Sequence, residues 1–129
     1  MRHIFLFFFL FLSVTVLRSE NFIVNSQSSF NNALNASSAG DTIFWENGVF
    51  NNIFLDIDED DIVVTAIELG QTVFSSNSYA EISGDNVVFR GFQYLNGNIG
   101  DEHVIDITGD DVTIIEINIE PTLVINICV

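Results

Sequence analysis

The chain has 129 residues, with 18 acidic residues against three arginines and no lysine, and its formal net charge is −15 at neutral pH. A surface this acidic repels nucleic acid, acidic membranes and acidic polysaccharides unless cations intervene, so we expect no nucleic-acid partner. The single cysteine, Cys128, excludes an intrachain disulfide bond.

Residues 1–19 have the pattern of a secretory signal peptide. An apolar run over residues 4–12 follows two basic residues and is too short to span a bilayer comfortably. Leu17 and Ser19 are acceptable at the −3 and −1 positions of a cleavage site before Glu20. We therefore expect export to the extracellular space or a periplasm, with no membrane contact after cleavage; an uncleaved amino-terminal anchor is the alternative.

Cleavage makes the chain still more acidic. All 18 acids lie from Glu20 onward and Arg90 is the one remaining arginine, so the mature chain carries a net charge of −17. Such a surface favours a cation, or a ligand that is reached through a cation, as its partner.

A short capping helix is expected within residues 20–40. Phe30, Ala33 and Leu34 fall on one helical face, behind serines that suit an N-cap, and Gly40 follows as a stop. A helix in this place can cover the open first coil of a stack of strands, where unpaired edges would otherwise be exposed.

Residues 41–129 contain a repeat of 25 residues. The segments 59–64, 84–89 and 109–114 align at this spacing without a gap. The strong apolar columns of this register are Leu55/Ala80/Ile105, Ile57/Ile82/Ile107, Ile62/Val87/Val112, Val64/Phe89/Ile114, Ile67/Phe92/Ile117 and Leu69/Tyr94/Ile119. The weaker columns are Val49/Phe74/Ile99/Val124 and Phe54/Tyr79/Val104/Val129.

The strong columns come in pairs two residues apart, which indicates three short strands in each repeat. Strands stacked in this way predict an all-β fold, a right-handed parallel β-helix, whose handedness follows from the preference for right-handed crossovers. A β-sandwich is the alternative, but it does not account for the gapless register. About three full coils are followed by part of a fourth that ends at Val129. This pattern predicts either a fragment of a longer protein or a short protein that self-associates through its uncapped carboxyl-terminal coil.

Several motifs follow one another in a fixed order. Ala-Gly-Asp-Thr-Ile at 39–43 precedes Asn-Gly-Val-Phe at 47–50, and Val-Val-Thr-Ala at 63–66 precedes the glycine-rich segment 82–97 and Ile-Thr-Gly at 107–109. Through these motifs the chain resembles the amino-terminal part of polysaccharide lyase family 6, the alginate lyase and chondroitinase B family.

This resemblance implies β-elimination on anionic uronate polysaccharides such as alginate or chondroitin, with Ca²⁺, a lysine and an arginine supplied by later coils. The chain has no lysine, and Arg90 lies in an early coil outside the family's catalytic motif. No catalytic residue carries over, so we expect no activity from this chain alone. The alternative is a non-catalytic extracellular β-solenoid that binds carbohydrate or cations.

Two columns of acids also follow the 25-residue register. Asp56, Glu81 and Asp106 are expected in mid-strand on the outward face, where they form a candidate Ca²⁺ site; simple screening by salt is the alternative. The other column is Asp60/Asp85/Asp110, at bends, where the carboxylates are expected to accept local backbone N–H groups. His103 is expected at the surface, and Trp45 is expected to pack under the capping helix.

Overall fold

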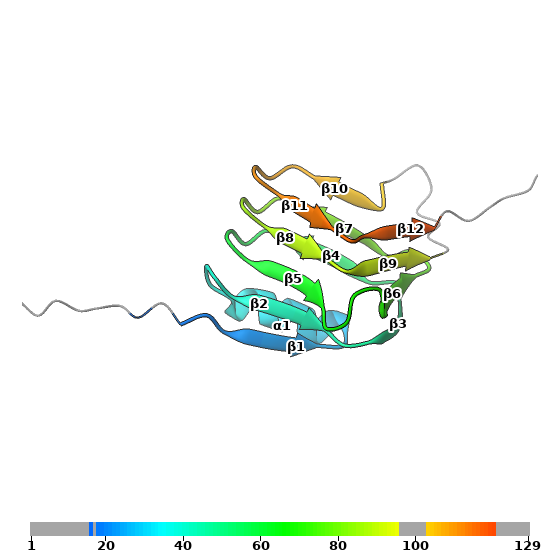
Figure 1. Ribbon diagram of the computed structural model, residues 1–129, viewed down its shortest axis with the longest axis horizontal. Helices are drawn as coiled ribbons and strands as arrows, with labels where there is room; N and C mark the ends of the chain where they lie inside the picture. Colours follow the sequence, from blue (N-terminus) through cyan, green and yellow to red (C-terminus); the bar gives the residue numbers. More distant parts are fainter. Residues whose placement is uncertain (1–15, 17, 96–102, 121–129) are drawn as a thin grey trace, which may run out of the picture.

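The computed structural model describes residue 16 and residues 18–95 and 103–120 of the chain. These residues form one helix and a series of short strands (Figure 1). The elements are β1 (Asn21–Val24), α1 (Gln27–Ala36), β2 (Thr42–Trp45), β3 (Gly48–Asn51), β4 (Phe54–Ile57), β5 (Val63–Ala66), β6 (Thr72–Ser75), β7 (Tyr79–Ile82), β8 (Val88–Arg90), β9 (Phe92–Leu95), β10 (Ile105–Ile107), β11 (Thr113–Ile115) and β12 (Asn118–Glu120).

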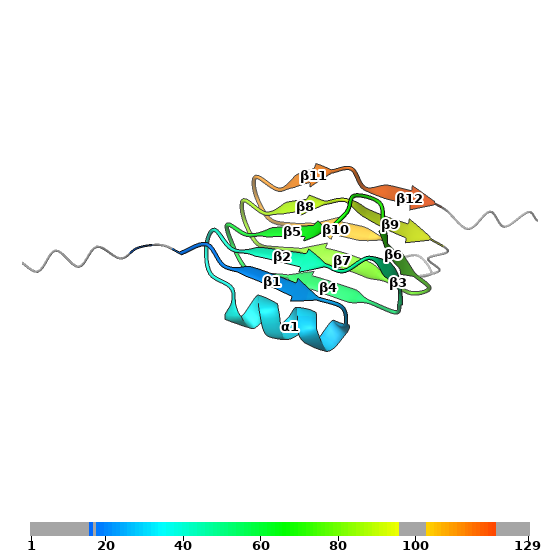
Figure 2. The ribbon, with the colours of Figure 1, turned by 60° about the horizontal axis from the view of Figure 1, so that its bottom comes forward.

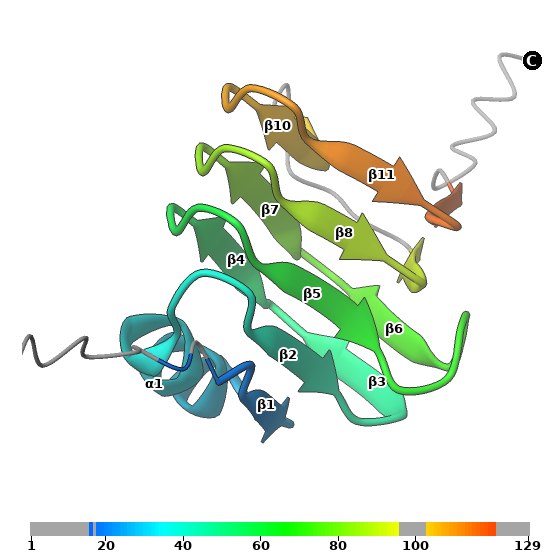
Figure 3. The same cartoon turned by 60° about the vertical axis from the view of Figure 1, so that its left-hand side comes forward.

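The strands form three parallel sheets, and successive coils contribute one strand to each. The first sheet has the order β1-β2-β5-β8-β11, the second β10-β7-β4, and the third β12-β9-β6-β3. Each strand pairs in parallel with its counterpart one coil away, and the coils stack along one axis (Figures 1 and 3). The predicted parallel β-helix is confirmed.

The 25-residue register is confirmed in the second sheet and, from β5 onward, in the first sheet, whose earlier strands β1, β2 and β5 are paired 21 residues apart. In the second sheet Leu55 lies opposite Ala80 and Ala80 opposite Ile105. In the first sheet Val64 lies opposite Phe89 and Phe89 opposite Ile114. Leu55, Ala80, Val64 and Phe89 are fully buried, because these columns face the interior of the helix.

The third sheet follows a different register, and three predicted columns each contain a wrong member there, although Tyr94 lies opposite Ile119 as predicted. Phe74 lies opposite Phe50 and Tyr94, not in a column with Val49. Ile67 and Leu69 are not inward members of a strand; they lie between β5 and β6 with 46% and 43% of their surface exposed. The predicted column members Ile99, Val124 and Val129 lie outside the described residues.

Turns of unequal length explain why the third sheet has a different register from the other two. Five residues, 67–71, separate β5 from β6, whereas Gly91 alone separates β8 from β9. The chain between β9 and β10 is longer than the chain between β6 and β7, so the other two sheets return to the 25-residue spacing. A constant spacing in the sequence therefore conceals two length changes that compensate each other.

An aromatic column fills the interior where the first and third sheets meet. Trp45 is fully buried and packs against Phe30 of α1, with ring centroids 5.8 Å apart, which confirms the position predicted for it under the helix. It also packs against Phe50, at 5.2 Å, and Phe74, at 5.0 Å, and Phe74 in turn contacts Tyr94 at 5.4 Å. Large rings buried in this way are a main contribution to stability.

The predicted capping helix is confirmed as α1. Ser26 is its N-cap and exchanges hydrogen bonds with Ser29 in a capping box, and Phe30, Ala33 and Leu34 are its buried residues. The helix lies across the end of the stack formed by β1 and β4, opposite the end formed by β11 and β12 (Figure 2). The strand β1, which precedes the helix, was not predicted.

The predicted signal peptide lies largely outside the described residues. Ser19 and Glu20, at the predicted cleavage site, are described and bond to the start of the next coil: the Ser19 hydroxyl donates to the Gly40 carbonyl, and the Glu20 N–H donates to Asp41 at 2.7 Å. Within the described part of the chain, no helix is long and apolar enough to cross a membrane.

Close stacking at the bends predicts the effect of a single methyl group. A Cβ atom added at Gly84 would overlap the carbonyl oxygen of Glu59 in the preceding coil. We expect Gly84→Ala to lower the free energy of unfolding by about 2 kcal/mol in urea titrations, because the two coils must move apart. Ser83→Ala, at the exposed neighbouring position, is the control and should change it by less than about 0.5 kcal/mol. Equal stability of the two variants would contradict the stacking described.

Candidate functional site

The outward face of the second sheet gathers acids and aromatic rings. The register places Asp56 opposite Glu81 and Glu81 opposite Asp106, so the three predicted acids lie side by side on adjacent strands. All three are exposed. Beside them the rings of Phe54 and Tyr79 stack, with centroids 4.4 Å apart and planes inclined by 28°.

The three acids form a row and do not converge on a point. Among the described residues, no group of three or more histidine, cysteine, aspartate or glutamate side chains is placed to hold a metal ion. Protein-bound Ca²⁺ takes roughly six to eight oxygen ligands. A cation at this row would therefore lie between two neighbouring carboxylates and keep most of its water.

The same face is hollowed in two places. The larger hollow, of about 300 Å³, lies between α1 and β4 and is lined by Gln27, Asn31, Leu34, Asn35, Phe54, Asp56 and Asp58. The smaller hollow, of about 160 Å³, is lined by Tyr79, Glu81, His103 and Asp106. His103 is exposed, as predicted, but it lines this hollow together with two members of the acid row.

The helix residues of the larger hollow were not singled out from the sequence. Gln27, Asn31 and Asn35 recur at intervals of four residues, which places them on one helical face. Phe54, Asp56 and Asp58 alternate along β4 and its continuation, which places them on one face of the strand. The two spacings were a usable signal, but the contact between helix and strand was not visible in the sequence.

The second acid column has a structural role at the bends. One carboxylate oxygen of Asp60 accepts the backbone N–H of Asp85 at 2.8 Å, and Asp85 accepts the N–H of Asp110 at 2.9 Å. These carboxylates were expected to accept local N–H groups; instead each accepts a group from the next coil. The bonds therefore link successive coils and account for this column without a ligand.

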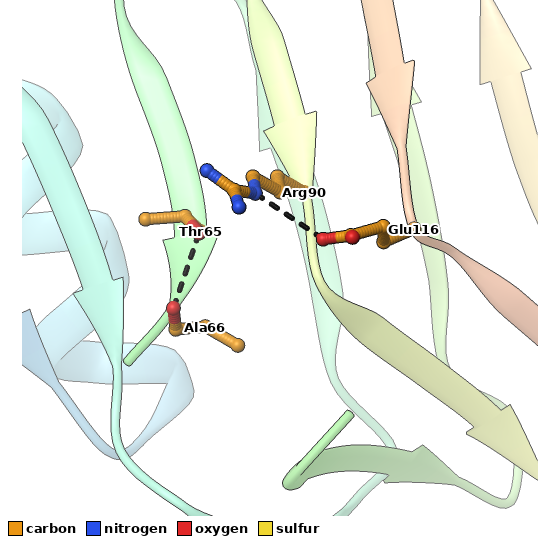
Figure 4. A network of polar contacts seen from close by, with 4 residues as sticks. All are labelled: Thr65, Ala66, Arg90 and Glu116. Atoms are coloured by element: carbon orange, nitrogen blue, oxygen red, sulfur yellow. Dashed lines mark hydrogen bonds and ion pairs between the residues drawn. The ribbon is translucent and has the colours of Figure 1, made fainter. Parts of the chain in front are cut away.

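Arg90 lies on a different face from the acid row. It belongs to β8 in the first sheet, and its Nε is 3.4 Å from Oε2 of Glu116. Figure 4 shows the pair beside Thr65 on the neighbouring strand β5. Both side chains are about half exposed, so the ion pair contributes little to stability, typically about 0–1 kcal/mol.

Tyr94, on β9, is buried inside the coil. Its side chain is 2% exposed, burial raises its pKa, and its hydroxyl has no hydrogen-bond partner among the described residues. Because the hydroxyl lies inside the coil, it is out of reach of a ligand on any of the three outer faces.

These features define a capped parallel β-helix protein with a polar, hollowed outer face. A family model described as Chondroitinase B matches residues 24–126, which is most of the chain. The chain belongs to the chondroitinase B family.

Solved structures agree with this assignment. The structure of alginate lyase AlyGC, of the PL6 family, and that of an arginine-to-alanine mutant of AlyGC each match with a TM-score of 0.72 and 16% sequence identity. Each match covers 77% of this chain but 15% of the AlyGC chain. This likeness shows the fold, and the resemblance to polysaccharide lyase family 6 is confirmed. No curated protein sequence matches the chain.

Proposed function

We propose that this chain forms the capped amino-terminal coils of an exported β-helix protein that cleaves uronate polysaccharides, such as alginate or chondroitin, by β-elimination. In this proposal the coils are a scaffold, a fragment of the complete catalyst, and the chain is inactive alone. The supporting observation is the family match over residues 24–126, together with a span of 15% of the AlyGC chain.

The chemistry of the described faces supports a scaffold role. β-Elimination next to a uronate needs a cationic group to neutralise the carboxylate, a base for the C5 proton and an acid for the leaving oxygen. The chain has no lysine, and Arg90 pairs with Glu116. The hollowed face carries Asp56, Glu81 and Asp106, which repel a uronate carboxylate.

The strands at the end of the stack opposite α1 favour the addition of further β-structure. β10, β11 and β12 are edge strands of their sheets, so one side of each is unpaired within the described chain. Their inward residues Ile107, Ile114 and Ile119 are 43%, 38% and 46% exposed. An edge of this kind accepts another strand, either from a further coil or from a second copy of the chain.

Lyase activity tests the first part of the proposal. The full chain is incubated with alginate and with chondroitin in the presence of Ca²⁺, and the ultraviolet absorbance of the unsaturated product is followed. We expect no increase over a heat-denatured sample of the same chain, because the chain has no lysine and its Arg90 is paired with Glu116. An increase with either polymer would contradict the scaffold role.

A measurement of self-association tests whether the edge strands β10, β11 and β12 pair with a second copy of the chain. We expect the full chain to form dimers or larger species in sedimentation velocity runs, more at high salt than at low salt, because salt screens the repulsion between acidic copies. Ile114→Ser should weaken this association roughly tenfold, a change of about 1.4 kcal/mol. Ile23→Ser is the control, since Ile23 is 64% exposed but lies on β1 at the other end. Equal association of the two variants would contradict pairing through the edge that contains Ile114.

Cation binding is a second candidate function, favoured by the row of three acids on one sheet face. We infer that Ca²⁺ binds weakly between neighbouring carboxylates of this row and offers a bridge to anionic sugars. Calorimetric titration should give heat and a higher melting temperature with Ca²⁺, and Glu81→Gln, the central position, should abolish both. If the unsubstituted chain gives no heat and no rise in melting temperature at millimolar Ca²⁺, this inference is contradicted.

A further inference from the structure

The larger hollow has one wall from the capping helix and one from an edge strand. Gln27, Asn31 and Asn35 line it from α1, and Phe54, Asp56 and Asp58 line it from β4 and the residue that follows. Its volume of about 300 Å³ falls at the lower limit of small-molecule sites, which are roughly 300–1,000 Å³. Its strand wall belongs to the second sheet, whereas Arg90 belongs to β8 of the first sheet.

One of the helix amides is already used by the fold. The Gln27 side chain donates to the carbonyl of Phe54 at 2.6 Å and accepts the N–H of Phe54 at 2.7 Å. It thereby takes the place of a neighbouring strand, because β4 is the last strand of its sheet. Gln27 also donates to Oδ1 of Asn31 at 3.0 Å, which fixes the orientation of that amide.

The remaining polar groups are available to a ligand. With its oxygen turned to Gln27, Asn31 presents its amide N–H₂ as a donor. Asn35, Asp56 and Asp58 are exposed and line the same hollow. The hollow therefore offers amide donors on the helix side and carboxylate acceptors on the strand side, a set that matches the hydroxyl groups of a sugar, each of which both donates and accepts.

An aromatic surface completes the site. The Phe54 ring is partly exposed in the hollow and is supported from behind by Tyr79, at 4.4 Å between centroids. The face of an aromatic ring carries negative charge density and attracts the weakly positive C–H groups on one face of a pyranose. The ring supplies apolar contact, and the amides and carboxylates supply orientation.

The charge of the site determines the class of sugar. Asp56 and Asp58 line the hollow, and Glu81 lies beside Asp56 on the next strand. A carboxylated sugar would meet like charges on the strand side, whereas a neutral hydroxyl group makes a strong bond to a carboxylate. We propose that the hollow between α1 and β4 binds a neutral hexose unit, in a site separate from any site for the uronate substrate.

Binding of uncharged sugars to the full chain tests this site. The probes are cellohexaose, mannohexaose and laminarihexaose, with an alginate-derived uronate hexamer for comparison, and binding is measured by calorimetry and by changes in amide NMR signals. We expect at least one neutral hexamer to bind and to perturb signals of α1 and β4. The double variant Asn31→Ala/Asn35→Ala should weaken this binding at least tenfold.

The control lies on the same helix. Asn32 is exposed but does not line the hollow, so Asn32→Ala should leave binding unchanged. All three substitutions replace exposed helical asparagines by alanine, which raises helix propensity, so the fold is retained. Three results would overturn the proposal: no binding of any neutral hexamer, equal binding by the double variant, or binding of the uronate hexamer as strong as that of the neutral ones. The test uses no uronate cleavage, so its failure leaves the proposed lyase function untouched.

Discussion

Each coil of this β-helix can bury its inward side chains only against the coils above and below it. Val64, Phe89, Leu55 and Ala80 are fully buried because neighbouring coils place like residues opposite one another in register. Within the described residues, the coils at the two ends of the stack have a neighbouring coil on one side only, so their other side differs from that of the inner coils. At the amino-terminal end α1 covers the first strands and Gln27 substitutes for a missing strand neighbour. At the other end, within the described residues, no further strand pairs with the outer edges of β10, β11 and β12.

Burial in a stack of coils also determines where the acidic residues lie. A carboxylate is costly to bury unless it is hydrogen-bonded, as in the buried Asp41, which accepts the N–H groups of Glu20 and Ser38. The other acids of the described residues lie on outward faces and at bends, and these two positions have different consequences. At the bends Asp60 and Asp85 accept N–H groups of the next coil and thereby stabilise the stack. On the second sheet Asp56, Glu81 and Asp106 are exposed in a row and repel anionic ligands. This face therefore repels a uronate carboxylate, whereas the partners proposed for it, a neutral sugar or a cation, meet no such repulsion.

The sequence predicted the coils well where the turns have constant length. The columns of Leu55 and Val64 were found because two sheets keep a 25-residue spacing. The third sheet was misassigned, since the turn 67–71 shifts the partner of Tyr94 from Leu69 to Phe74 and a later length change hides the shift. The acid row was predicted for the same reason as the columns. The hollow beside α1 was not, because each of its two walls has a regular spacing but nothing in the sequence shows that the helix packs against the strand.

The register of the third sheet offers the most direct measurement, because it separates the stacked structure from a simple 25-residue repeat. Nuclear Overhauser contacts between backbone protons of the labelled chain report which strands are neighbours. We expect contacts between Phe74 and Tyr94, together with contacts between Glu81 and Asp106 in the second sheet. Contacts between Leu69 and Tyr94 in place of those between Phe74 and Tyr94 would contradict this register.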